Sequence, residues 1–128
     1  MHYKKIIDGI VVKGFGEGAF FMSMGHYKKE IKNKLGFNTY PGTLNLKVGK
    51  KQEDLLKNIK PIKIKGFKAG NKTFGGANCY KAKIKNINGA IIVPVINKHK
   101  DIIEFISPFH IKSKLKIKDG DKIKVELL

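Results

Sequence analysis

The stretch that decides the fold is Tyr40-Pro41-Gly42-Thr43-Leu44-Asn45-Leu46. A proline–glycine turn opens it, and the residues that follow alternate between polar and apolar. Successive side chains of a strand point to opposite faces, so Leu44 and Leu46 share one face while Thr43 and Asn45 share the other. The stretch therefore predicts a strand that two leucines pin to a core, with a hydroxyl and a carboxamide side by side on the opposite face.

The two polar side chains of this strand have two interpretations. Neutral oxygens at this spacing suit a hard cation such as Mg²⁺, whose other ligands are waters and substrate phosphates. Alternation of this kind is also typical of an ordinary half-buried strand with a polar outer face. The local pattern alone leaves the choice between Thr43 and Asn45 as metal ligands and a plain polar face open.

The composition indicates one globular domain over residues 1–128, with 41% apolar residues and a mean hydropathy of −0.26. The sequence has no apolar run of about 18 residues, so we expect no membrane span. Asp8 follows the N-terminus too closely for a signal peptide. The single cysteine, Cys79, has no cysteine partner for a disulfide or a zinc site, and we therefore expect a cytoplasmic location.

The net charge of +17 predicts attraction to polyanions such as nucleic acid, nucleoside triphosphates or anionic surfaces. All of the side chains behind this charge are lysines, because the sequence contains no arginine. Arginine is preferred for bidentate reading of guanine, so its absence argues against sequence-specific DNA recognition. The lysines are scattered, and a general compositional bias toward lysine explains them equally well.

A glycine-rich loop follows the first predicted strand, Ile6–Val12, and has glycine at positions Gly14, Gly16 and Gly18. Glycine permits positive φ and close approach of a ligand, and successive N–H groups of such a loop bind anions. The apolar run Ala19–Met22 predicts a second strand, which would place the loop between two strands. A plain hairpin turn is then favoured over a phosphate cradle.

Three further segments have clear local patterns. An apolar stripe predicts a helix over His26–Leu35, capped by Gly36, with its lysines forming a solvated face. A short helical turn is predicted over Glu53–Asn58. The glycine-rich segment Lys68–Gly76, which Gly66 precedes, predicts a hairpin or an exposed loop.

The rest of the chain alternates between short strands and turns. A continuous apolar run ending at Pro94 suits burial on both faces, and a short helix is expected from Pro108. The remaining strands are predicted at Ile62–Lys65, Tyr80–Lys85, Ala90–Pro94 and Ile123–Leu127, with turns at Asn86–Gly89 and Lys118–Asp121 and a connecting loop at Val95–Lys100.

The predicted strand Ile102–Ile106 carries a carboxylate, Glu104, on the same face as two isoleucines. A charge among apolar neighbours is costly unless it is paired or used. Glu104 is therefore either a functional acid or an acidic residue that protects an edge strand from aggregation. Many short strands, short helical insertions and no βαβ rhythm together predict a small, mostly antiparallel β-barrel.

The combination of motifs resembles the archaeal CTP-dependent riboflavin kinases, in family order and spacing over nearly the whole chain. The matching pieces are Gly14–Gly18, Leu35–Phe37, Gly42–Leu46, Gly89–Pro94, Ile102–Glu104 with Pro108, and Lys118–Asp121. The resemblance implies a six-stranded cradle-loop (RIFT-like) β-barrel. It also implies transfer of the CTP γ-phosphoryl group to the ribityl 5′-hydroxyl of riboflavin, with FMN and CDP as products.

The resemblance also implies site residues. Thr43 and Asn45 would bind Mg²⁺, and Asn97 and Glu104 would contact the flavin. Glu104 would orient the 5′-hydroxyl or accept its proton. The nucleotide would be bound by Gly14, Phe15, Gly16, Glu17, Gly18 and Ala19, and by Phe109, His110, Ile111 and Lys112. The alternative function, suggested by charge alone, is a non-enzymatic barrel that binds nucleic acid; it lacks arginine and an interleaved aromatic stacking platform.

Overall fold

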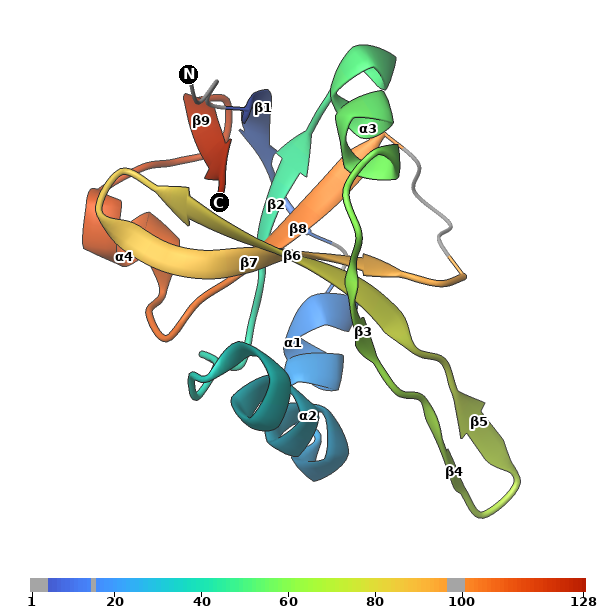
Figure 1. Ribbon diagram of the computed structural model, residues 1–128. Helices are drawn as coiled ribbons and strands as arrows, with labels where there is room; N and C mark the ends of the chain where they lie inside the picture. The colour runs from blue at the N-terminus through green and yellow to red at the C-terminus, as the bar shows by residue number, and fades with distance from the viewer. Residues whose placement is uncertain (1–4, 15, 97–100) are drawn as a thin grey trace.

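The computed structural model describes residues 5–14, 16–96 and 101–128, and Figure 1 shows how they are arranged. Strands dominate this part of the chain, as predicted. The elements are β1 (Lys5–Val12), α1 (Glu17–Met22), α2 (Gly25–Leu35), β2 (Leu44–Lys47), α3 (Lys50–Lys57), β3 (Ile62–Ile64), β4 (Phe67–Ala69), β5 (Lys72–Phe74), β6 (Ala77–Ile84), β7 (Ile87–Pro94), β8 (Ile102–Ile106), α4 (Ile111–Leu115) and β9 (Lys122–Leu127).

Six antiparallel strands close into a barrel in the order β6-β7-β8-β2-β1-β9. Closure comes from β9, which pairs with β1 along its length and with Ala82 and Lys83 of β6. β3 pairs with the other half of β6, through Ala77–Cys79, and so lies at the end of the sheet. The predicted six-stranded antiparallel barrel is confirmed.

The barrel interior is filled by the inward-facing residues of alternating strands. Leu46 of β2, Val125 of β9 and Phe105 of β8 are almost completely buried there. α3 and α4 add Leu56 and Ile111 to the same core. The period-two patterns of the sequence therefore become one continuous apolar interior, as the alternation predicted.

A second apolar core lies outside the barrel, between its wall and the two helices α1 and α2. Met22 and Ile31 of these helices pack against Ile92 of β7 and Ile106 of β8. Figure 1 shows α1 and α2 together on one side of the barrel. β7 is thus buried on both faces, which confirms the prediction drawn from the continuous apolar run that ends at Pro94.

The predicted strand over Ala19–Met22 is wrong, because these residues belong to helix α1. Gly16 adopts a left-handed φ of 83° and starts the helix, which then buries Met22 under the second core. A run of four apolar residues fits a strand or one turn of a helix equally well, and the packing partner decides between them. The glycine-rich loop therefore leads from a strand into a helix, and the hairpin interpretation is also wrong.

The other helices follow the sequence patterns with shifted boundaries. α2 is confirmed, and Gly36 caps it with a φ of 85°. α3 begins at Lys50, earlier than predicted. α4 begins at Ile111 instead of Pro108, because the Ser107 hydroxyl bonds to both the N–H and the carbonyl of Phe109 and holds a turn there. None of the helices in the described ranges has the length and apolar character needed to cross a bilayer.

One turn of the sheet differs from the sequence prediction, and one predicted hairpin is confirmed. Ile84 pairs with Ile87, so β7 starts earlier and the turn shortens to Lys85 and Asn86, with Lys85 at a φ of 53°. The glycine-rich segment forms the hairpin that was predicted, here called the arm (residues 66–76, strands β4 and β5). In Figure 1 the arm projects away from the barrel on the side of α1 and α2.

Candidate functional site

A cavity of about 790 Å³ lies beside the outer face of β2 and β8. Its walls come from segments that are far apart in the sequence. They include the glycine-rich loop with α1, the turn before β2 with β2 itself, the returning strand of the arm, β8, and the segment 107–112 that leads into α4, and parts of α2 and β7 also contribute. The fold thus gathers nearly all of the predicted motifs around one hollow.

Thr43, Asn45 and Glu104 lie together on one face of the sheet and are half-buried. Asn45 is the register partner of Glu104 across β2 and β8, so their side chains project to the same side. The Thr43 hydroxyl donates a 2.9 Å hydrogen bond to Oε1 of Glu104. The Asn45 amide donates to the Thr43 carbonyl over 3.4 Å. These three side chains, called the polar trio below, form one connected group in the cavity wall.

The glycine-rich loop packs directly on the polar trio. A Cβ atom at Gly14 would collide with the side-chain amide of Asn45. At Gly18 a Cβ atom would collide with the Thr43 hydroxyl and lie 2.9 Å from Oε1 of Glu104. Only glycine permits an approach this close, so two of the three glycines are explained by contact with the trio. The loop and the polar strand face form a single site.

The loop also supplies backbone donors to the cavity. Glu17, Gly18 and Ala19 open α1 and line the hollow. The first N–H groups of a helix have no acceptor within the helix, so they are available to an anion. These residues therefore fit the role of holding phosphate oxygens, which their side chains alone would not suggest.

The segment before α4 forms the neighbouring wall. The His110 ring contacts Ser113 Oγ through Nδ1 over 2.6 Å, and the Tyr40 ring lies 5.1 Å from the His110 ring, tilted by 33°. Lys112 borders the cavity while its ammonium pairs with Asp119 at 2.7 Å. Tyr40 was not predicted as a site residue, although it stands at the head of the stretch that decides the fold.

The far end of the cavity is apolar and aromatic. Phe21 and Met22 of α1, Tyr27 of α2 and Phe74 of the arm line it, together with Ile92 of β7. The Phe21 ring meets the rings of Tyr27 and Phe74 edge-on, at 6.1 and 6.4 Å. Sequence reasoning missed this end of the cavity, because its residues belong to four elements and share no local motif.

The structure brings together all of the predicted site residues that it describes. The glycine-rich loop, the polar trio and the segment Phe109, His110, Ile111 and Lys112 all line the cavity. Ile111 has a double role, because it is buried in the barrel core as well. Phe15 and Asn97, predicted to contact the nucleotide and the flavin, lie outside the described residues.

The position of β8 decides one of the alternatives for Glu104. β8 lies between β7 and β2 inside the closed barrel, so the acidic residue does not protect an edge strand. Ile106, on the same face, is covered by the second core, whereas Glu104 borders the cavity. The structural explanation of an edge gatekeeper is therefore wrong.

The side-chain oxygen atoms of the polar trio are of the kinds that coordinate a hard divalent cation. They comprise a hydroxyl, a carboxamide and a carboxylate, which are the oxygen ligands that Mg²⁺ takes in proteins. The described residues hold no cluster of three or more histidine, cysteine or acidic side chains that could bind a metal. A cation at the trio would therefore complete its shell with water and phosphate oxygens, as Mg²⁺ does in phosphoryl-transfer sites.

Cys79 is excluded as a nucleophile. The thiol is fully buried in the second core, and burial raises its pKa to about 12. A thiol needs its thiolate form to attack, so Cys79 stays inert near neutral pH. The chemistry of this site has to come from oxygen and nitrogen groups.

Comparison with known proteins agrees with the site. The family model of the CTP-dependent riboflavin kinases (CTP-dep_RFKase, described as domain of unknown function DUF120) matches residues 11–127. The chain belongs to this family. The match covers the glycine-rich loop from Gly14 on, the polar trio and the segment before α4, so the family assignment and the cavity rest on the same part of the molecule.

Curated relatives from archaea are similar over nearly the whole chain. A riboflavin kinase of Pyrobaculum islandicum is 41% identical over 125 residues, covering 94% of this chain and 59% of the relative. One of Archaeoglobus fulgidus is 39% identical over 140 residues (100% and 60%), and one of Pyrococcus furiosus is 43% identical over 129 residues (98% and 60%). The chain thus spans about 60% of the length of these relatives.

Proposed function

We propose that this protein transfers the γ-phosphoryl group of CTP to the ribityl 5′-hydroxyl of riboflavin and so produces FMN and CDP. The observation that carries this proposal is the contact between the glycine-rich loop and the polar trio. The contact supports the proposal because it brings a loop with backbone N–H groups, two neutral side-chain oxygens and a carboxylate into one cavity, and phosphoryl transfer requires bound phosphates, a metal site and an oriented acceptor.

The residues divide the work by their chemistry. The N–H groups at the start of α1 hold the phosphates of the nucleotide, and Lys112, whose ammonium pairs with Asp119, borders the neighbouring wall. His110 and Tyr40 offer flat surfaces beside that wall for the base. The aromatic end of the cavity receives the ring system of riboflavin, so that the ribityl chain extends toward Glu104.

The transfer breaks the bond between Pγ and its bridging oxygen and forms a bond between Pγ and the ribityl oxygen. Bound Mg²⁺ supplies charge neutralisation for the phosphate oxygens. Thr43 and Asn45 hold the phosphate end in place, and Glu104 orients the 5′-hydroxyl and is placed to accept its proton. The Thr43 hydroxyl, by bonding to Glu104, fixes the carboxylate that faces the acceptor.

Chromatography of a mixture of the protein with riboflavin, CTP and Mg²⁺ tests the proposal. We expect FMN and CDP to appear together in equal amounts. A mixture in which riboflavin stays unchanged contradicts the proposed activity. If the protein instead shows only a steeply salt-dependent shift with nucleic acid, the net charge of +17 serves nucleic-acid binding and the kinase proposal is wrong.

Replacing CTP by ATP in the same mixture tests the nucleotide. We expect slower FMN formation with ATP, and a smaller rise in melting temperature, because a ligand that binds only the native state stabilises it more the lower its Kd is at a given concentration. Equal shifts with both nucleotides at matched Mg²⁺ contradict the preference for CTP.

A further inference from the structure

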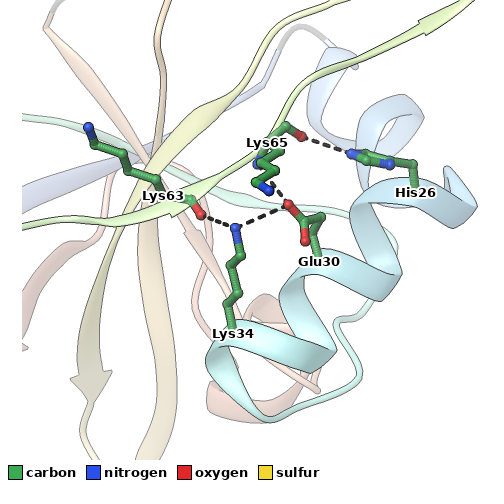
Figure 2. A network of polar contacts seen from close by, with 5 residues as sticks. All are labelled: His26, Glu30, Lys34, Lys63 and Lys65. Atoms are coloured by element: carbon green, nitrogen blue, oxygen red, sulfur yellow. Dashed lines mark hydrogen bonds and ion pairs between the residues drawn. The ribbon is translucent and has the colours of Figure 1, made fainter.

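Helix α2 is tied to the exposed edge of β3 by three polar side chains, which Figure 2 shows reaching from one side of the helix toward that strand. His26, Glu30 and Lys34 stand at i, i+4 and i+8, so they share one face. Glu30 accepts the Lys65 N–H at 2.9 Å, and His26 Nε2 lies 2.8 Å from the Lys65 carbonyl. Lys34 donates to the Lys63 carbonyl at 2.7 Å and pairs with Glu30 at 3.2 Å.

This set of contacts, called the latch below, corrects the sequence prediction for Lys34. The lysines of α2 were expected to form a solvated face, but Lys34 is half-buried and bonded to the backbone of β3. β3 is the last strand of the sheet, so Lys63 and Lys65 would otherwise present unpaired backbone groups there. The latch holds the strand that leads into the arm.

The strand that returns from the arm is held by the same helix. The Tyr27 hydroxyl, next to His26 on α2, donates to the Gly75 carbonyl at 2.6 Å. A Cβ atom at Gly66 would collide with the Phe74 carbonyl, so the outgoing and returning strands touch backbone to backbone at the base of the arm. α2 therefore fixes the base of the arm from both strands.

The base of the arm is also a wall of the cavity. Phe74, Gly75 and Gly76 line the hollow, and the Phe74 ring stacks on Phe67 at 4.8 Å with only 15° between the planes. Phe74 gives this wall an aromatic ring, whereas the polar trio and the glycine-rich loop line the cavity with polar groups. An aromatic ring held in this way suits contact with a planar ring system.

We propose that α2 is a positioning element for the acceptor: Tyr27 through Gly75, and Glu30 through Lys65, hold the aromatic arm wall against the planar ring of the acceptor and so set its affinity. This inference rests on the proposed function. The nucleotide end of the cavity is held by the strand register of β2 and β8 and by the glycine contacts, so it does not depend on the latch.

Steady-state kinetics of four variants test the proposal, with the KM for riboflavin and the KM for CTP measured separately. Tyr27→Phe removes only the hydroxyl, and losing one such hydrogen bond should raise the KM for riboflavin roughly threefold to tenfold. The KM for CTP and kcat at saturating riboflavin should stay within about twofold. Glu30→Ala should shift the same constant in the same direction, and Glu30→Gln should restore it, because glutamine keeps an oxygen that accepts the Lys65 N–H.

Tyr80→Phe is the matched control, since Tyr80 packs on the barrel core and is not one of the residues that line the cavity. It should leave the KM for riboflavin unchanged. An unchanged KM for riboflavin in both Tyr27→Phe and Glu30→Ala overturns the proposal, and so does a parallel rise of both KM values with a lower melting temperature. If Tyr27→Phe does not fold, the Glu30→Ala and Glu30→Gln pair decides alone. If the parent protein forms no FMN, the proposed function is refuted instead. The affinity for riboflavin is then measured by fluorescence quenching, and the inference still predicts weaker binding by Tyr27→Phe and Glu30→Ala than by the parent.

Discussion

The two ends of the cavity are built by different kinds of interaction. At the polar end, strand register places Asn45 opposite Glu104, and backbone contact presses Gly18 onto Thr43 and Glu104. At the aromatic end, side chains of α2 reach across to the backbone of the arm, as Tyr27 does to Gly75. The strand register and the glycine contacts allow almost no displacement of the backbone at the polar end. At the aromatic end, the loss of one side-chain hydrogen bond should weaken the arrangement only slightly.

Under the proposed function, this difference means that the two substrates are positioned with different precision. Phosphoryl transfer depends on placing the reacting atoms closely, so the polar end has to be rigid. A flat ring on an aromatic wall needs contact area more than exact placement, so an end held by a few hydrogen bonds is sufficient. Changes at the polar end should therefore act mainly on turnover, and changes at the aromatic end mainly on affinity for the acceptor.

The largest effects are expected at Glu104. Glu104→Ala should lose both turnover and affinity for riboflavin, because it removes the carboxylate that Thr43 orients. Glu104→Gln separates the two roles. If the carboxylate accepts the proton, kcat falls roughly 10²–10⁴-fold with riboflavin binding nearly unchanged. If it only orients the hydroxyl, the glutamine variant keeps much of its activity. A Glu104→Ala variant that matches the parent in both constants would refute any role for this residue.

The next largest effect is expected from a single methyl group in the glycine-rich loop. In Gly18→Ala the new Cβ would collide with the Thr43 hydroxyl and displace the loop from the trio, so kcat should fall roughly 10- to 100-fold. Gly25→Ala is the matched control, because a Cβ there has nothing within 4 Å. Both glycines are helical, so helix propensity cannot explain a difference. Equal kcat values for the two variants would contradict the close contact.

The smallest effect concerns the pH dependence of the latch. The Lys65 N–H and the neighbouring Lys34 hold the pKa of Glu30 below its usual value of 4.5. Because the folded state lowers this pKa, the stabilisation is fully present above about pH 4.5 and is lost as the pH falls through the folded value. At pH 7 the parent should therefore melt at a higher temperature than Glu30→Gln. The corresponding difference in the free energy of unfolding should be less than about 1 kcal/mol.

That difference should shrink as the pH is lowered below 4.5 and vanish once Glu30 is protonated. Melting curves of the two proteins between pH 3 and 7 measure it. Asp54→Asn is a suitable control, because the Asp54–Lys57 pair on α3 lies away from the arm and is largely exposed. A gap between the parent and Glu30→Gln that stays constant with pH would show that the ionised form of Glu30 does not stabilise the latch.

The two ends of the cavity also differ in how much of them the sequence could predict. The sequence predicts that Thr43 and Asn45 share one face of a strand, because alternation is a local pattern and alternate side chains of a strand point to the same side. Their contact with Gly14 and Gly18 could not be predicted, because the apolar run after the loop fits a strand or a helix equally well and the structure forms helix α1 there. Burial of Met22 in the second core, which distant residues create, decides that segment.

The aromatic end could not be predicted at all. Tyr27 and Gly75 are 48 residues apart, and no motif connects them. The polar stripe of His26, Glu30 and Lys34 was a weak signal, because its helical spacing puts three side chains on one face that could contact another part of the protein instead of water. That partner is the edge of β3, which only the topology of the sheet reveals.

The central proposal, that Thr43 and Asn45 would hold a Mg²⁺ ion that neutralises the charge of the nucleotide phosphates, is tested most directly by a Mg²⁺ titration of Thr43→Val and Asn45→Ala. Both variants should stay folded, because Leu44 and Leu46 still pack in the barrel core. Turnover at limiting Mg²⁺ should fall roughly 10²-fold or more, and higher Mg²⁺ should recover part of it. Asn88→Ala, an exposed position on β7, should follow the parent curve. If both site variants keep the parent's activity at limiting Mg²⁺, the pair is only the polar face of a strand and the account is wrong.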